Sequence, residues 1–165
     1  MLPLNQSLGC YQQLSSLNVN QHYLQLVNLK KNHLRILIVE DDYLLAKGMA
    51  KLIGRLSGYH VRVTDKIDEV FRLCQGGKVD LVIMDVNLPE ANWEEKDVSG
   101  ADISRLLKRN SQTAEIPIIL ITAYALESER QSLLDLSQAD ELYIKPITDY
   151  DHLVKTINQL CGHSA

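Results

Sequence analysis

The stretch that decides the fold is LRILIVEDD, residues 34–42, in which a strand-length apolar run leads directly into Glu40, Asp41 and Asp42. The run does not alternate between apolar and polar residues, so both faces of the strand should be covered, as in a parallel sheet flanked by helices. Similar short runs follow along the chain at 80–84 and 116–121, and 141–144 is a fifth, short strand candidate. Residues 59–63 alternate instead, which suits an edge strand.

Helical periods separate these runs. Apolar residues in 45–56 recur at steps of three and four, and Gly58 follows where a C-terminal cap belongs. Thr148 and Asp151 are spaced like a capping box before the last helix. Comparable helical patterns cover 67–74, 103–107, 126–134 and 153–160. Five alternating strand–helix units predict an α/β fold with a doubly wound parallel sheet between two helical layers.

Composition narrows the class of protein. The chain has 165 residues, of which 45% are hydrophobic and 23% charged, which suits one soluble domain with a short extension. A net charge of −4 gives no basic face for nucleic acid. No apolar run approaches the ~20 residues needed to span a bilayer. Cys10, Cys74 and Cys161 are widely separated, as expected of free thiols. We expect a cytoplasmic protein that binds neither nucleic acid nor membrane.

The N-terminal residues 1–33 form an extension to the predicted domain at 34–162. They are rich in Gln, Asn, Ser and Leu, with no charged side chain before Lys30. A weakly helical stripe and a disordered tail fit this composition equally well. Either a partner-binding arm or a loosely packed extension is compatible with it, and the extension is favoured. The stripe consists of Leu14, Leu17, Leu24 and Val27.

Polar side chains gather where the predicted strands end. In a doubly wound sheet, ligands bind beyond the carboxyl ends of the strands. A single acidic residue there can simply cap a helix, but four strand ends supplying carboxylates, a hydroxyl and an amine favour a site. The residues are Glu40, Asp41 and Asp42, then Asp85, Thr122 and Lys145.

Such a cluster suits phosphate chemistry supported by a hard cation. Crowded carboxylates repel one another unless a cation neutralises them. Magnesium takes one or two carboxylates, keeps several waters and completes its shell with phosphate oxygens. Lys145 supplies a positive charge and Thr122 a hydroxyl donor for phosphate oxygens, while the Asp85 carboxylate can act as a nucleophile and form an acyl phosphate.

Four motifs together resemble the response-regulator receiver family of two-component phosphorelays, over roughly residues 34–161. They are ILIVEDD at 36–42, VIMDVNLP at 82–89, ILITA at 119–123 and YIKP at 143–146. The resemblance implies a flavodoxin-like sheet of strand order 2-1-3-4-5.

The resemblance also implies a magnesium site. In it, Asp41 binds the ion directly and Glu40 through water, Asp85 is a ligand, and Asn87 offers its main-chain carbonyl. Asp42 is expected at a helix start and not as a ligand.

A further set of roles follows from the resemblance for the phosphoryl group. Asp85 matches the phospho-acceptor, and Thr122 and Lys145 match the residues that hold the phosphoryl oxygens. The bond between Lys145 and Pro146 is expected to be cis.

The function implied is that of a single-domain response regulator. It takes a phosphoryl group from a histidine kinase or histidine phosphotransfer protein with magnesium, and signals by protein contact through the last two strand–helix units. It is not expected to turn over an outside substrate, only to promote its own phosphorylation and slow dephosphorylation. The alternative is a non-phosphorylated pseudo-receiver that binds proteins, against which the intact Asp85, Thr122 and Lys145 argue. A phosphohydrolase would need an acid where Asn87 stands.

Two positions depart from the family pattern. Leu142 stands three residues before Lys145, where an aromatic residue is common, and Tyr143 must point to the opposite face of the strand. The loop 89–100 is longer than in relatives and holds Trp93. Trp93 is interpreted either as a partner anchor or as a side chain folded onto the surface, and the second is favoured.

Overall fold

The computed structural model describes residues 34–89, 91–123 and 127–162. The predicted extension 1–33 lies outside these described residues. The sheet is built from five strands: β1 Arg35–Val39, β2 His60–Thr64, β3 Leu81–Asp85, β6 Ile118–Thr122 and β7 Glu141–Ile144. The helices are α2 Tyr43–Ser57, α3 Ile67–Gln75, α4 Gly100–Arg109, α5 Glu127–Ser137 and α6 Tyr150–Leu160.

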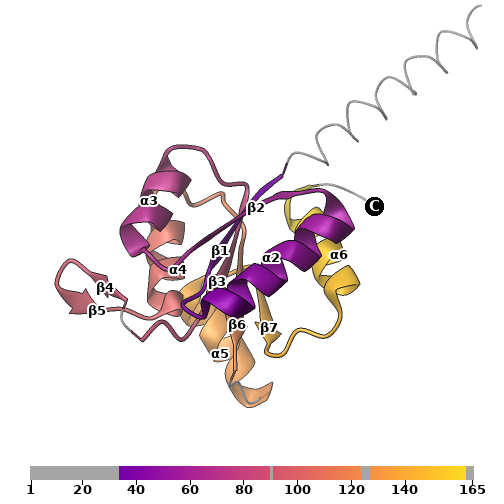
Figure 1. Cartoon of the computed structure of the whole chain (residues 1–165). Coiled ribbons are helices and arrows are strands. Elements are labelled where there is room, and N and C mark those ends of the chain that lie inside the picture. Colours follow the sequence, from indigo (N-terminus) through magenta and orange to yellow (C-terminus); the bar gives the residue numbers. More distant parts are fainter. Residues whose placement is uncertain (1–33, 90, 124–126, 163–165) are drawn as a thin grey trace, which may run out of the picture.

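All five strands pair in parallel, in the order β2-β1-β3-β6-β7 (Figure 1). Numbered by strand–helix unit, this is the expected order 2-1-3-4-5, and the alternating second strand lies at an edge as predicted. The reversal of order between β1 and β3 places the carboxyl ends of these two strands side by side at the centre of the sheet.

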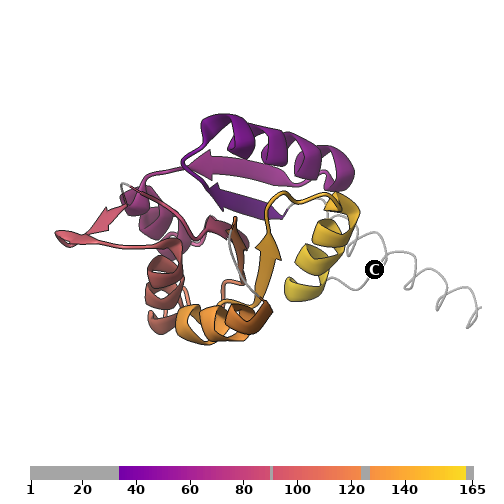
Figure 2. The same ribbon diagram turned by 90° about the horizontal axis from the view of Figure 1, so that it is seen from below.

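Side chains of the inner strands alternate between two cores. On one face, Leu37, Val82 and Leu120 pack with α3 and α4. On the other, Ile36 and Ile83 pack with α2 and α6. Helices therefore cover both faces (Figure 2), which explains why these strands read as continuous apolar runs.

The helix ends follow local chemistry, with one correction. Gly58 ends α2 in the left-handed conformation at φ 76°, as predicted. Ser99 and Asp102 form a capping box at the start of α4. The capping box predicted from Thr148 and Asp151 is wrong: α6 is capped by Asp149, whose side chain accepts a hydrogen bond from the main-chain N–H of His152. Asp149 competes successfully because it directly precedes the first helical residue.

The long loop after β3 contains a small hairpin, β4 Asn92–Trp93 and β5 Lys96–Asp97, with Glu94 and Glu95 at positive φ in its turn. The Trp93 ring stacks on Phe71 of α3, with ring centroids 4.1 Å apart. The favoured interpretation of Trp93, a side chain folded onto the domain surface, is therefore the one the structure supports.

The apolar stripe predicted for α2 is only half buried. Met49 and Ile53 lie in the core, whereas Leu45, Leu52 and Leu56 remain exposed. In the described part of the chain, no helix combines the length and apolar character that crossing a membrane requires.

Candidate functional site

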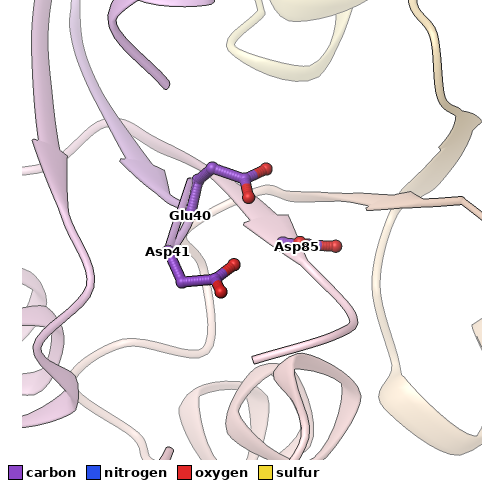
Figure 3. Close-up of side chains that lie close together, drawn as sticks. All are labelled: Glu40, Asp41 and Asp85. Atoms are coloured by element: carbon purple, nitrogen blue, oxygen red, sulfur yellow. The ribbon is translucent and has the colours of Figure 1, made fainter. Parts of the chain in front are cut away.

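Three carboxylates meet at the central edge of the sheet. Glu40 and Asp41 directly follow β1, and Asp85 ends the neighbouring β3 (Figure 3). One oxygen of each carboxylate lies within 4.8 Å of the others. Glu40 and Asp85 are buried, whereas Asp41 is exposed. These three residues, which the sequence grouped by their places at strand ends, lie together in the structure because parallel strands paired in this register end at one edge.

Lys145 follows β7 and reaches across to this cluster. Its Nζ donates hydrogen bonds to Glu40 Oε2 at 2.7 Å and to Asp85 Oδ2 at 2.8 Å. The Lys145 side chain is itself largely buried. Charged hydrogen bonds in such surroundings are stronger than neutral ones, so this amine holds two carboxylates in place.

The electrostatics of the cluster follow from burial and crowding. Burial raises the pKa of Glu40, and the charge of Asp85 adds to the effect, while the hydrogen bond from Lys145 opposes it. Burial alone would lower the pKa of Lys145, but its hydrogen bonds to Asp85 and Glu40 outweigh this and raise it. The Lys145 amine bonds two of the three carboxylates of the cluster, so these four side chains together lack positive charge.

Two polar neighbours behave differently from the cluster. Asp42 accepts hydrogen bonds from the main-chain N–H groups of Leu44 and Leu45 at 3.0 Å each, so it caps α2 as expected. Asn87 is exposed, and its main-chain N–H donates to Asp85 Oδ1 at 3.2 Å. The Asn87 N–H thus binds one oxygen of the Asp85 carboxylate while Lys145 binds the other.

Thr122 lies at the end of β6, between β3 and β7 in the sheet. Its side chain is buried at the same sheet edge, and its main-chain carbonyl accepts a hydrogen bond from the Lys145 N–H at 2.8 Å. The bond between Lys145 and Pro146 is cis, which confirms the expectation from the family resemblance.

The donor set fits a hard divalent cation. Three carboxylates that can converge on one point, two of them buried, offer the oxygen ligands that magnesium takes, and the exposed Asp41 leaves an open side for water and phosphate. The Lys145 amine already balances part of the same negative charge. Glu40, Asp41 and Asp85 therefore form a candidate metal site.

Gly100, the first residue of α4, was not singled out in the sequence. Its main-chain N–H donates to the Val86 carbonyl at 3.0 Å. A Cβ added at Gly100 would lie 1.8 Å from the Asp85 carbonyl oxygen. Glycine is therefore required where α4 begins against the main chain of the candidate acceptor. An isolated glycine near a helix start is too common a signal to reveal such a contact.

A cleft of about 950 Å³ opens beside Asp41. Its walls come from the segment after β2, the start of α3 and the loop before the hairpin, and Lys66 and Arg72 contribute positive charge. Sequence reasoning missed these two residues, although Lys66 stands shortly after a strand end. The lining also includes Asp65, Glu69, Leu88 and Asn92.

Leu142 stands where the family commonly has an aromatic residue, and it faces the opposite side of β7 from its neighbour Tyr143. Leu142 is buried in the core formed with α3 and α4. Tyr143 packs toward α6, where its hydroxyl shares hydrogen bonds with His152 Nδ1 at 2.8 Å and Thr156 Oγ1 at 2.7 Å. The structure confirms that Tyr143 lies on the face of β7 opposite to Leu142. Tyr143 therefore does not replace the aromatic side chain that the family commonly has at that position.

Comparison with known proteins decides the family. The model of the response regulator receiver domain matches residues 36–158. The chain belongs to the response regulator receiver family. This receiver is similar to DivK, the polar-differentiation response regulator of Brucella anthropi: the two are 30% identical over 127 residues, which cover 77% of this chain and 95% of DivK.

Solved receiver structures share the fold. The signal receiver domain of a signal transduction histidine kinase from Syntrophus aciditrophicus has a TM-score of 0.64 and 26% identity, covering 78% of this receiver and 89% of that chain. The receiver domain of a sensor histidine kinase from Pseudomonas aeruginosa has a TM-score of 0.63 and 23% identity, covering 79% and 98%. In that Pseudomonas structure a magnesium ion is coordinated in the active-site cleft.

Proposed function

We propose that this receiver accepts a phosphoryl group on Asp85 from a histidine kinase or a histidine phosphotransfer protein, with magnesium bound at the acidic cluster. The observation that carries the proposal is the convergence of Asp85 with the Glu40 and Asp41 carboxylates and the Lys145 amine. Together they supply a nucleophile, a metal site and a cation for phosphate oxygens.

The chemistry is a substitution at phosphorus. An Asp85 oxygen forms the new P–O bond while the P–N bond to the donor histidine breaks. The electron pair of that bond returns to the ring, which is protonated on its other nitrogen and so leaves as neutral imidazole. Lys145 neutralises charge on the phosphoryl oxygens, and the Asn87 N–H holds the other Asp85 oxygen. Glu40, Asp41 and Asp85, together with the Asn87 carbonyl, would hold magnesium, which would supply further stabilisation of the charge on the phosphoryl group.

The proposal includes the limits of the activity. The protein promotes its own phosphorylation and slow dephosphorylation and turns over no outside substrate. Asn87 supports this limit, because an amide cannot exchange protons as a general acid or base.

Output is proposed to occur by protein contact through the last two strand–helix units, in the cytoplasm. Each of these units exposes a large apolar side chain, Leu136 on α5 and Ile144 on β7. Apolar side chains such as these would supply contacts at the buried centre of a protein interface.

The test is incubation with a small phosphodonor and magnesium, followed by intact-mass spectrometry. We expect a gain of one phosphoryl group that is lost in Asp85→Asn and after chelation of the metal. Asp42→Ser is the matched control: it removes the neighbouring carboxylate but keeps a good helix cap, so labelling should persist.

The pseudo-receiver alternative predicts a different pattern. No labelling of the parent chain, either by small donors or by a histidine phosphotransfer donor that labels another receiver, would overturn the proposal and favour a protein-binding module.

A further inference from the structure

Strand β2 lies at an edge of the sheet, and among the described residues no strand pairs with its outer side. It pairs with β1 alone, in an unbroken register of five residues. Proline and β-bulges are common devices that keep another strand from adding to an edge, and β2, with the sequence HVRVT, has neither. Its outer side is therefore open to an added strand.

Two hydrogen bonds to β1 identify the main-chain groups on that outer side. The His60 N–H, at the start of β2, donates to the carbonyl of the residue before β1 at 2.9 Å. The Thr64 carbonyl, at the end of β2, accepts from the N–H of the residue after β1 at 3.2 Å. In a parallel pair, every second residue bonds to the neighbouring strand. His60, Arg62 and Thr64 therefore bond to β1, and the N–H and C=O groups of Val61 and Val63 point outward.

A hollow lies beside β2 on each face of the sheet. Val61 and Val63 pack with the core under α2, and with Ala50 they line a hollow of about 480 Å³ on that face. Arg62 and Lys78 line a second hollow, of about 170 Å³, on the α3 face. The side chains of an added strand alternate between the two faces, as those of β2 do, so they would enter the two hollows in turn.

The α3 face beside β2 favours an acidic side chain. Arg62 and Arg72 both form ion pairs with the single carboxylate of Glu69, and Lys78 is exposed at the hollow, so these four side chains together carry excess positive charge. The Arg62 side chain is 58% exposed and can bind a second carboxylate. On the opposite face, the half-buried Val61 favours apolar side chains.

Charge also decides between possible occupants of this edge. A second copy could pair its β2 with this β2 about a twofold axis, with Val61 of each copy bonded to Val63 of the other. That arrangement places the two Arg62 side chains directly opposite each other, and like charges so placed destabilise a pair of strands. Residues 1–29 contain no Asp or Glu, so they supply no carboxylate for Arg62. The chemistry of the edge thus fits a segment of another protein.

We propose that the outer edge of β2 binds an extended segment of a partner protein in which an acidic residue stands between two apolar ones. The main-chain groups of Val61 and Val63 bond the segment, its apolar side chains fill the hollow beside them, and its carboxylate binds Arg62. In the sheet order, β2 is the strand farthest from β7, so this surface is separate from the last two strand–helix units. The inference does not depend on phosphorylation of Asp85.

The test titrates the isotope-labelled full chain with the acetylated, amidated peptide TVEVEVT and measures amide hydrogen exchange by NMR. Without peptide, we expect the N–H groups of Val61 and Val63 to exchange rapidly, because they point outward, whereas the Arg62 N–H is protected by its bond to β1. At about 90% occupancy only the free tenth of the chains exchanges, so exchange at the two valines should slow about tenfold. Exchange at Arg62 should change little.

A charge reversal tests the role of Arg62. The peptide TVKVKVT should bind about fivefold more weakly than TVEVEVT, because its lysines meet a positive surface and exposed ion pairs contribute modestly. Arg62→Glu should reverse this preference. The matched control is Arg109→Glu, an exposed arginine on α4, which should leave the preference unchanged.

Methylated peptides test the main-chain bonds. TVEVEVT methylated on its valine nitrogens and TVEVEVT methylated on its glutamate nitrogens keep the same side chains and the same charge. Alternate N–H groups of a strand point to the same side, so one of these peptides should lose binding and the other should retain it. Loss on methylation of the valines indicates an antiparallel added strand, and loss on methylation of the glutamates a parallel one.

Four results would overturn the proposal. They are no slowing at Val61 and Val63 with millimolar TVEVEVT, an equal effect of the two methylations, a preference for TVEVEVT that persists in Arg62→Glu, and protection of both valines before any peptide is added. The last result would mean that the edge is already covered. Protection that grows with protein concentration would then assign the edge to a second copy, and protection independent of concentration would assign it to the chain itself.

Discussion

Replacing Gly100 with alanine tests how closely the start of α4 is set against the acceptor strand. The new Cβ would lie 1.8 Å from the Asp85 carbonyl oxygen, where real Cβ atoms keep at least 3.0 Å. The two atoms must therefore separate by about 1.2 Å. The Met84 side chain, 2.9 Å away, closes off one direction of relief, so α4 or the Asp85 main chain has to move.

The size of the effect follows from that displacement. Overpacking of this kind costs about 1–3 kcal/mol of unfolding free energy, which a domain of this size tolerates. A misplacement of about 1 Å in a reacting group lowers a rate by about 100-fold. We therefore expect Gly100→Ala to remain folded but to lose about two orders of magnitude in the rate of magnesium-dependent phosphorylation.

The assay is the time course of phosphoryl gain by intact mass, run well below the unfolding midpoint that circular dichroism gives for the variant. Gly48→Ala is the matched control, since its Cβ meets nothing within 4 Å. It should keep the parental rate and gain up to about 1 kcal/mol, as expected for alanine in a helix. A Gly100→Ala variant that phosphorylates at the parental rate would refute the argument.

Three further predictions concern the metal, the hairpin and the start of α4. Magnesium should stabilise the parent against unfolding by about 1.4 kcal/mol for each tenfold excess over its dissociation constant. The same ion should stabilise Asp41→Asn much less. Thermal denaturation with chelated controls measures both effects. Trp93→Ala should lower the free energy of unfolding by about 1–2 kcal/mol, because it loses the stack on Phe71. Urea titration measures this loss, and phosphorylation should be unchanged. An unaltered urea midpoint would argue against a packed hairpin. Hydrogen bonds from the side chain and main chain of Ser99 hold the pKa of Asp102 below its ordinary value. The stability that this carboxylate contributes is therefore present above its ordinary pKa and lost as pH falls through the lowered pKa. Asp102→Asn should be less stable than the parent near neutral pH and should approach the stability of the parent in acid. A difference in stability that stays constant across pH would contradict this.

The sequence was most informative where a local pattern has one physical outcome. Strands buried on both faces must be apolar throughout, so runs such as 116–121 identified the inner strands of the sheet. The carboxyl ends of parallel strands must meet at one edge, so Asp41, Asp85 and Lys145 could be grouped before any distance was known.

Contacts made across the fold were harder to predict. The period of α2 shows an apolar side but not how much of it the sheet and α6 can cover, so the exposure of Leu52 was unexpected. The hairpin turn uses Glu94 and Glu95 at positive φ, where the usual signal is Gly or Asn. The need for glycine at position 100 arises from the Asp85 main chain, which is distant in sequence.

The double ion pair of Lys145 has a consequence for the order in which the protein is made. Lys145 is separated from Asp85 by 60 residues and from Glu40 by 105. During synthesis, the ribosome releases both carboxylates well before the amine that neutralises them. A nascent chain that has folded its first strands must carry these acids without their counterion, which opposes their burial. The acidic edge therefore becomes stable only when the last strand–helix unit is complete. Chains truncated before this unit should fold poorly and be cleaved readily by proteases.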